Sequence, residues 1–591
     1  MKNIRLYLIM ASIAVLTSCI GDVLDKRPLD IISEDVLWND ANLVDSYLAQ
    51  QYSQMHIFRF DASLPTQGDW AERSAFLDVM NVSDEMGRGA WFDNGIWYKI
   101  GGLTISGGLL EWWDQAYAII RQLNMLIEKL PQSANDADFI ASRVADARFL
   151  RAFNYFALVK RYGGVPLITK EIAINAPEDE LYPARNSEQE IYDFIISESD
   201  AIEEQVKSFT TYGRVSQGAV LALKCRAALY AGSVAQFGTV QLNGLLGIPQ
   251  TQASAYYQKS CDAAKKIISL NQYALYNDDD NKVTNFKNVF LKEQNREMIF
   301  VRPFDETRDS WYYGFLNCPK PHGYDLGMTS APYLEMAEEF EYIDGRPGTL
   351  DRNVIQQGLW SMEELWGDRD PRFYASMYTN GTPWMGTVVD WHRGLIGSDG
   401  VLYETQQDAY NGVPAIGTQN LLGIIFGSGF GVMKMLNEAS DANFTERDGI
   451  DCPIFRYAEI LLNLAEASFE LGQVDEALDA LNQIRDRAGI TLKTAIDREA
   501  IRHERKVELA FEGHRYWDVR RWRIAVDKLS KPGSSLQYVL DYNTRKYQLI
   551  VFPDYDGPTT PPLFYERNYY FPITLNRTAQ NPNLLENTGY N

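Results

Sequence analysis

The sequence predicts a mainly α-helical protein of about four helical hairpins, with a large loop-rich insert that forms the ligand-binding face. Two patterns support this prediction. Apolar residues recur at helical spacing in several long segments, as in helices that pack one face against a core. Between residues 381 and 431, eleven of 51 residues are glycine, where about 7% is usual. The first pattern predicts the scaffold, and the second predicts the loops.

Six segments before residue 271 show apolar residues at helical spacing. They are residues 41–55, 112–130, 138–162, 187–207, 216–235 and 253–270. Ser187 is followed three residues later by Glu190, which is the capping-box pattern at the start of a helix. Paired in order, the six segments give three helical hairpins.

A fourth hairpin is predicted from residues 453–488. Ala465 and Ala477 lie twelve residues apart between flanking leucines, and Gly472 supplies the short turn between the two helices. Small side chains let antiparallel helices approach closely, and this spacing is typical of tetratricopeptide repeats. We therefore expect stacked hairpins that bury one continuous core and present another face to a partner.

The insert, at about residues 300–450, contains aromatic residues that include Trp384 and Trp391. Loops carried by a rigid scaffold often hold binding residues. No change in composition marks a separate domain, so we expect the insert to elaborate one folded unit.

The N-terminus predicts a lipoprotein signal peptide over residues 1–18. Lys2 and Arg5 precede an apolar run at residues 6–15, and the sequence LTSC ends at Cys19. The run is too short for a spanning helix, which needs about 20 residues. Cleavage before Cys19 would free its thiol for lipid attachment, and several acyl chains together anchor a protein firmly to a membrane. An ordinary signal peptide with an incidental cysteine is the alternative.

The formal net charge of −23 argues against nucleic acid and anionic lipid as partners, because phosphates attract basic surfaces. Neutral or cationic ligands fit this charge better. Cys225, Cys261, Cys318 and Cys452 follow the signal, with no CxxC pair and no histidine at metal-ligand spacing. We therefore expect no metal site and no cofactor. We interpret Cys225 and Cys261 as small buried residues, although a disulfide among the four cysteines stays open.

Several blocks in order along the chain resemble the SusD/RagB family. They are ARFLRAFNYFALVKRYGGVPLI at 147–168, GRVSQGAVLALKCRAALYA at 213–231, RDPRFYASMY at 369–378, the hairpin at 451–489, IRHERKVELAFEGHRYWDVRRW at 501–522 and FPITLNRTAQNPNLLENTGYN at 571–591. The resemblance implies an N-terminal helical half, residues 19–235, and a C-terminal half, residues 236–591, which includes the insert.

Members of this family are lipoproteins that capture ligands on the outer face of the outer membrane. They bind glycans, or peptides in some members, for a TonB-dependent transporter. The resemblance implies that the helical face packs on a SusC-like transporter and that the protein acts as a hinged lid delivering oligosaccharide. A peptide-binding relative, a glycan-degrading enzyme and a lid without ligand affinity are the alternatives.

A glycan site needs flat aromatic rings for the C–H faces of sugars and polar side chains for their hydroxyl groups. The segment SDEMGRGAWFDNGIW contains both kinds of residue. Its candidates are the polar residues Asp84, Arg88 and Asn94 and the aromatic platforms Trp91 and Trp97. The resemblance adds Trp311, Tyr312 and Trp384 from the insert. Packing in the core or at an interface is the alternative for each tryptophan.

The block at 501–522 contains several histidines and carboxylates close together in sequence, as a catalytic site would. Arg505 and Glu508 lie three residues apart, as do Arg515 and Asp518, so we expect ion pairs along a helix. Gly513 should separate two helices. Neither HExxH nor GxSxG occurs in the chain, and these are the motifs that would indicate a zinc or serine site. We therefore expect a binding protein and not an enzyme.

Overall fold

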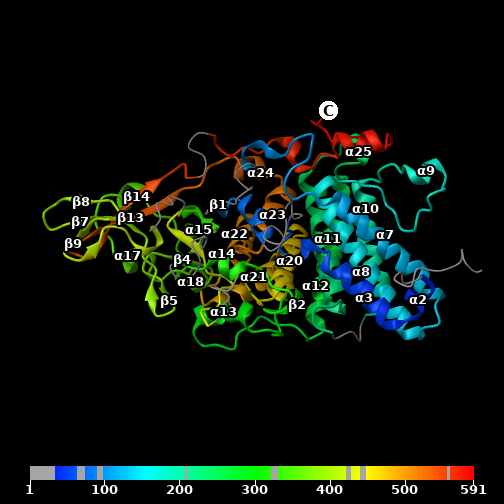
Figure 1. The fold of residues 1–591 in the computed structure, drawn as a ribbon, viewed down its shortest axis with the longest axis horizontal. Helices are drawn as coiled ribbons and strands as arrows, with labels where there is room; N and C mark the ends of the chain where they lie inside the picture. The colour runs from blue at the N-terminus through cyan, green and yellow to red at the C-terminus, as the bar shows by residue number, and fades with distance from the viewer. Residues whose placement is uncertain are drawn as a thin grey trace, which may run out of the picture.

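The computed structural model describes residues 34–62, 74–88, 98–206, 211–320, 330–420, 427–439, 447–555 and 560–590. The molecule is elongated, with the long helices at the right of Figure 1 and most strands at the left. Helices α20–α23 lie between these two ends. The protein is mainly α-helical, as the sequence predicts.

Each of the six segments predicted before residue 271 forms a helix. These are α3 (Ala41–Ser53), α7 (Trp113–Lys129), α8 (Ala137–Tyr162), α10 (Glu188–Ile202), α11 (Gln217–Phe237) and α12 (Ala253–Ser269). Helix α7 packs against α8, α8 against α10, α10 against α11, and α11 against α12. Ser187 and Glu190 form the expected capping box at the start of α10. The scaffold is thus a continuous stack of helices.

The fourth predicted hairpin consists of α20 (Tyr457–Glu470) and α21 (Val474–Ala488), and α20 packs against α12. Ala465 and Ala477 are fully buried. Gly472 has a φ of +78° in the turn, which only glycine adopts without strain. Gly513 has the same kind of conformation and separates α22 (Arg498–Glu508) from α23 (Arg515–Arg521), as expected.

Helix α11 has the length and hydropathy of a membrane-spanning helix. Nearly all of it is buried against its neighbours inside the protein. Its apolar character on all sides is typical of a central core helix.

The shorter helices connect the scaffold to the insert and to the C-terminus. They are α2 (Glu34–Asn39), α5 (Leu77–Asn81), α9 (Glu178–Leu181), α13 (Lys282–Leu291), α14 (Tyr313–Asn317), α15 (Leu334–Glu339), α16 (Arg352–Ile355), α17 (Met362–Trp366), α18 (Pro371–Ser376), α24 (Ala525–Lys528) and α25 (Leu575–Gln580). Those between residues 300 and 450 are only four to six residues long, as the loop-rich composition predicts.

Most strands form small antiparallel pairs. The pairs are β1 (Met86–Arg88) with β3 (Ser330–Pro332), β2 (Met298–Arg302) with β12 (Cys452–Arg456), β4 (Met377–Thr379) with β11 (Phe430–Val432), β5 (Pro383–Trp384) with β6 (Thr387–Val388), and β9 (Ala409–Tyr410) with β10 (Val413–Pro414). One four-stranded sheet has the order β14-β13-β7-β8. Its strands are β7 (His392–Ile396), β8 (Leu402–Tyr403), β13 (Ser535–Asp541) and β14 (Tyr547–Phe552). This sheet joins the insert to the chain that follows the last hairpin.

One hydrophobic cluster runs from Trp38 to Tyr590 and includes residues of both the scaffold and the insert. A second, small cluster around Leu395, Ala415 and Leu540 lies at the four-stranded sheet. The four cysteines in the described part of the chain are buried and unpaired. No disulfide therefore links them in this structure, and burial fits their interpretation as small core residues.

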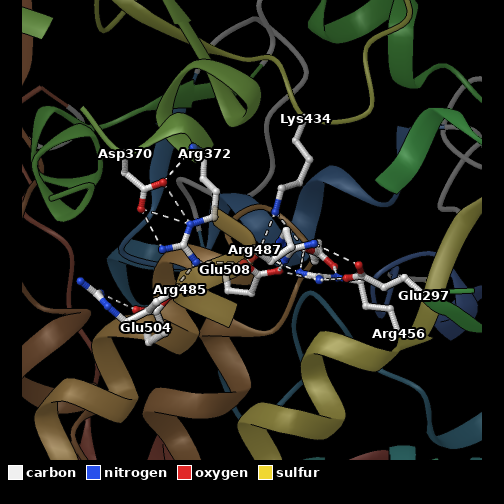
Figure 2. Close-up of polar contacts among 10 residues, drawn as sticks. Glu297, Asp370, Arg372, Lys434, Arg456, Arg485, Arg487, Glu504 and Glu508 are labelled. Carbon is white, nitrogen blue, oxygen red and sulfur yellow. Dashed lines mark hydrogen bonds and ion pairs between the residues drawn. The ribbon is translucent and has the colours of Figure 1, made fainter. Parts of the chain in front are cut away.

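A buried network of ion pairs connects the insert to the last hairpin and to α22 (Figure 2). Arg372 of α18 pairs with Glu504 at 2.6 Å and with Glu508 at 2.9 Å. Lys434 of the insert pairs with Glu512 at 2.8 Å, and Arg456 contacts the same carboxylate. Buried charges need such partners, because an unpaired one costs several kcal/mol. The network fixes how the insert sits on the scaffold.

The ion pairs predicted along the 501–522 block are wrong. Arg505 pairs with Asp518 at 2.7 Å and not with Glu508, whose partners come from α18, β12 and α21. Arg515 pairs with Asp84, which lies more than 400 residues away in sequence. The four side chains of these predicted pairs are buried, so they contact partners other than the ones that helical spacing predicts.

Candidate functional site

Asp84, a predicted sugar ligand, belongs to a buried ion-pair group. Its carboxylate lies 2.7 Å and 2.8 Å from the Arg515 guanidinium and 3.3 Å from Lys506 Nζ. Burial opposes ionisation, but these two cations outweigh it and hold the pKa of Asp84 well below its usual range. These ion pairs join the segment just before β1 to α22 and α23. In this structure the carboxylate of Asp84 therefore has a structural role and not a ligand-binding one.

The aromatic residues carried over from the resemblance lie in the core. Trp311 has no exposed surface and stacks on Phe304 with ring centroids 4.8 Å apart. Tyr312 and Trp384 are 5% and 1% exposed. None of these rings has a face open to a sugar in this conformation, so we assign all three to packing.

The other predicted residues are less fully described. Arg88 ends β1, where its backbone pairs with Ser330 of β3. Trp91, Asn94 and Trp97 lie outside the described residues, as does Cys19. Their proposed roles stay predictions.

A pocket in the insert has the composition expected of a polar-ligand site. Its volume is about 220 Å³. It is lined by Trp391, Arg393, Glu404, Gln406, Ile416, Asn420, Gly427, Gly429, Leu536 and Gln537. Strands β7 and β13 supply several of these residues, so the pocket lies at the four-stranded sheet.

Trp391 is the central residue of this pocket. It is 3% exposed, and one face of its ring stacks on Tyr378 with centroids 5.7 Å apart. Its Nε1 has no hydrogen-bond partner among the described residues. A buried N–H without a partner is costly. Trp391 lines the pocket but its Nε1 has almost no accessible surface in this conformation, so a ligand oxygen would reach this donor only after a small shift of the surrounding atoms.

The backbone of Gly427 closely approaches this N–H. A Cβ at residue 427 would lie 2.7 Å from Trp391 Nε1, which is shorter than any ordinary carbon contact. The backbone of Trp391 is held in place by its N–H, which donates to Asn380 Oδ1 at 2.7 Å. The indole is stacked on Tyr378 and lies against the Gly427 backbone, so a side chain at residue 427 would displace the ring.

The remaining walls combine polar and apolar groups. Arg393 donates a hydrogen bond to Gln537 Oε1, and Asn420 Nδ2 donates to the carbonyl oxygen of Trp391 at 2.6 Å. These bonds hold two polar side chains at the pocket wall. Glu404 is exposed and adds a carboxylate, while the half-buried Ile416 supplies apolar surface. Donors, an acceptor and apolar surface together suit a ligand with many hydroxyl groups.

Hydrogen bonds connect the pocket to the strand pair β1-β3, and the segment with the predicted aromatic residues Trp91 and Trp97 follows β1 in the sequence. Leu536 N donates to Ser428 O at 2.8 Å, and Ser428 Oγ donates to Pro332 O at 2.6 Å. Pro332 is in β3, which pairs with β1, and residues 89–97 directly follow β1. The pocket thus adjoins the strand pair from which the Trp91 and Trp97 segment leaves.

Sequence reasoning found the region of this pocket but missed its residues. The glycine-rich stretch at 381–431 includes Trp391, which was not chosen as a candidate. Arg393 has no motif around it, and Leu536 and Gln537 lie more than 100 residues later in the chain. Only the pairing of β7 with β13 brings them together.

Within the described ranges, no group of three or more histidine, cysteine, aspartate or glutamate side chains is placed to hold a metal ion. His514, one of the histidines of the crowded block, is buried, and burial together with nearby guanidiniums lowers its pKa well below its usual value. It is therefore neutral at physiological pH.

Comparison with known proteins identifies two family models that match this chain. Residues 36–260 match a family model described as starch-binding and associating with the outer membrane, and residues 296–590 match the SusD family model. The chain belongs to the SusD/RagB family. The two matches together include most of the helical scaffold and the whole insert.

Among curated relatives, the SusD-like protein P38 of Formosa agariphila is 24% identical over 89% of this SusD/RagB chain and 92% of its own length. The starch-binding protein SusD of Bacteroides thetaiotaomicron is also 24% identical, over 80% of this chain and 76% of its own.

Two solved structures illustrate the shared fold. A SusD-like protein from Bacteroides fragilis has a TM-score of 0.71 at 24% identity, covering 96% of this chain and all of that one. Surface glycan-binding protein A from Bacteroides thetaiotaomicron, solved in complex with laminarihexaose, has a TM-score of 0.59 at 18% identity and covers 92% of this chain and 99% of that one.

Proposed function

We propose that this SusD/RagB protein is a lipid-anchored outer-membrane protein that binds an oligosaccharide and passes it to a SusC-like TonB-dependent transporter. The observation that carries the proposal is the Trp391 pocket, where an indole N–H has no hydrogen-bond partner among the described residues. The names of two similar proteins, one starch-binding and one solved with laminarihexaose, support a saccharide as the ligand.

In this proposal a sugar hydroxyl oxygen accepts a hydrogen bond from Trp391 Nε1. The Arg393 guanidinium donates to a second oxygen, and the Glu404 carboxylate accepts from a hydroxyl group at the rim. Ile416 packs against the C–H surface of the sugar. The volume of about 220 Å³ suits one sugar unit, so the rest of an oligosaccharide would extend beyond the pocket.

The lipid anchor and the transporter follow from the sequence and the family. Acylation of Cys19 would hold the protein at the outer membrane, facing the cell exterior. The helical scaffold would contact the transporter barrel, and movement of the protein as a lid would release the ligand into it. No chemical change of the saccharide is required at any step, which fits a binding protein and not an enzyme.

The test compares Gly427→Ala with Gly358→Ala in the soluble protein that begins after Cys19. At residue 427 an added Cβ would lie 2.7 Å from a tryptophan Nε1, whereas at residue 358 the nearest atom, also a tryptophan Nε1, would be 3.7 Å away. We expect calorimetry with a panel of plant, host and microbial glycans to identify one that binds. Gly427→Ala should weaken that binding about tenfold or more, since a blocked hydrogen bond and lost contact are worth roughly 1.4 kcal/mol or more.

Gly358→Ala should bind like the original protein. Equal affinity in both variants would refute the Trp391 pocket as the site. Binding of peptides and of no glycan would replace saccharide capture with peptide capture. The loss of glycan uptake in cells that lack the protein tests the transport step separately.

A further inference from the structure

A second cavity, of about 570 Å³, lies between the scaffold and the C-terminal segment and shares no residue with the Trp391 pocket. It is bounded by the end of α11, by the turn that follows it, by Arg523 after α23 and by the segment Glu566–Tyr570. Its lining residues are Phe237, Gly238, Thr239, Gln241, Leu246, Arg523, Glu566, Arg567, Tyr569, Tyr570, Thr588 and Gly589.

Arg523 is held rigidly at this cavity. Its Nη2 donates to Tyr570 Oη at 2.7 Å, and its guanidinium carbon lies 4.7 Å and 4.8 Å from the ring centroids of Tyr569 and Tyr570. Its backbone φ is +56°, an unusual value for a residue with a side chain. The structure thus fixes both the backbone and the guanidinium of Arg523.

Arg523 has no direct ion pair. No carboxylate of the described residues lies within 4.0 Å of its guanidinium, whereas the nearby Arg521 contacts both Asp518 and Glu466. Glu188 is one hydrogen bond further away, because Tyr570 Oη donates to Glu188 Oε2 at 2.7 Å. The guanidinium therefore has electrostatic support from Glu188 but keeps donors that no protein carboxylate uses.

Arg567 places a second guanidinium at the same cavity. It is exposed, donates to the carbonyl oxygen of Gly589 at 3.3 Å and packs on Tyr565 and Tyr590. Glu566 also lines the cavity, but it is exposed and forms no ion pair with either arginine in the described structure. The cavity thus has two unpaired guanidiniums and one carboxylate that is free to face solvent.

We propose that this cavity is a second binding site, specific for a sugar that carries a carboxylate or a sulfate group. The forked guanidinium matches two oxygens of such an anion, which gives both strength and direction. Thr239, Gln241 and Thr588 line the same cavity and supply partners for sugar hydroxyls, and Phe237 and Leu246 supply apolar surface.

The net charge of −23 does not oppose this site. At physiological ionic strength, charges more than about 8 Å away are largely screened, so the two nearby arginines decide the local preference. The sequence alone favoured neutral or cationic ligands because it gives only the total charge and not the position of unpaired arginines.

The test is calorimetry on the soluble protein with glucuronate, galacturonate, glucose 6-sulfate, neutral glucose and inorganic sulfate. We expect at least one of the three anionic sugars to bind, with no binding of glucose. Arg567→Gln should weaken this binding by about tenfold, because a charge-assisted contact is worth roughly 1.5 to 3 kcal/mol. Arg121→Gln is the matched control, since Arg121 is an exposed arginine on α7 outside the cavity.

Arg523→Gln should abolish the binding while Gly427→Ala leaves it unchanged, which separates this site from the Trp391 pocket. Arg567→Gln keeps the test decisive if Arg523→Gln fails to fold, since Arg567 is exposed. The proposal is overturned if no anionic sugar binds, if glucose binds equally well, if inorganic sulfate alone binds, or if Arg121→Gln weakens binding as much as Arg567→Gln.

Discussion

Nη1 of Arg456 lies 2.7 Å from Oε1 of Glu508, and both side chains are buried. Glu508 also contacts Arg372 from the insert and Arg487 from α21. Burial opposes its ionisation, but the three guanidiniums outweigh this effect and hold its pKa well below its usual range. One carboxylate therefore joins the insert, the last hairpin and α22, and the network positions the sheet that forms the Trp391 pocket.

Glu508→Gln should lower the free energy of unfolding by about 3 to 5 kcal/mol, because three buried guanidiniums lose their shared negative charge. Urea unfolding followed by tryptophan fluorescence measures this loss. Glu499→Gln is the control, since Glu499 forms an exposed pair with Arg502 and its side chain is 73% exposed. We expect the control to change stability by less than about 1 kcal/mol, and equal losses in both variants would contradict a special role for Glu508.

The raised pKa of Glu85 predicts that the free energy of unfolding depends on pH. Burial and the adjacent Asp84 charge raise its pKa from 4.5 to about 7. The folded protein then binds a proton that the unfolded chain releases, so the contribution of Glu85 to stability falls as pH rises from about 4.5 to about 7. The decrease is on the order of 3 kcal/mol.

Glu85→Gln should remove that dependence. The difference in unfolding free energy between the original protein and the variant, measured in urea at pH 4.5 and pH 8, should shift by about 3 kcal/mol in favour of the variant at pH 8. The side chain accepts a hydrogen bond from Phe511 N at 3.3 Å, which the glutamine oxygen preserves. A difference that stays constant with pH would show that Glu85 ionises normally.

Trp311 should matter for stability and not for affinity. Trp311→Ala removes a fully buried ring from the core and should cost about 3 to 5 kcal/mol. Trp391→Phe should instead weaken glycan binding, since it removes the unpartnered N–H. Thermal unfolding and calorimetry on both variants, at a temperature where each is folded, separate the effects. Weaker binding by folded Trp311→Ala would restore Trp311 as a ligand residue.

Cys19→Ala tests the anchor. Cells grown with a labelled fatty acid should incorporate the label into the original protein and not into the variant, and the variant should leave the membrane fraction. Persistent labelling of Cys19→Ala would contradict lipid attachment at this residue.

The scaffold could be predicted because its information is local in the sequence. Helical spacing, the Ser187 capping box and the glycine turn at residue 472 each act within a few residues, and the structure has all of them. The resemblance likewise identified the family. Periodicity and motif order were sufficient for these conclusions.

The site residues were harder to predict because burial and long-range pairing decide their roles. Asp84 and Trp311 have suitable chemistry for sugar binding, but contacts with Arg515 and Phe304 commit them to the core. Conversely, Gln537 reaches the pocket only because β13 pairs with β7. A single sequence does not show which loop residues are buried in the core and which line a pocket in the folded protein.

The most direct test of the account is calorimetric titration of the soluble protein with the glycan found in the panel, comparing Trp391→Phe with the original protein. Loss of the indole N–H should weaken binding about fivefold to tenfold or more at a temperature where the variant is folded, since a neutral hydrogen bond contributes roughly 1 to 1.5 kcal/mol. Unchanged affinity would contradict the claim that the Trp391 pocket captures the ligand.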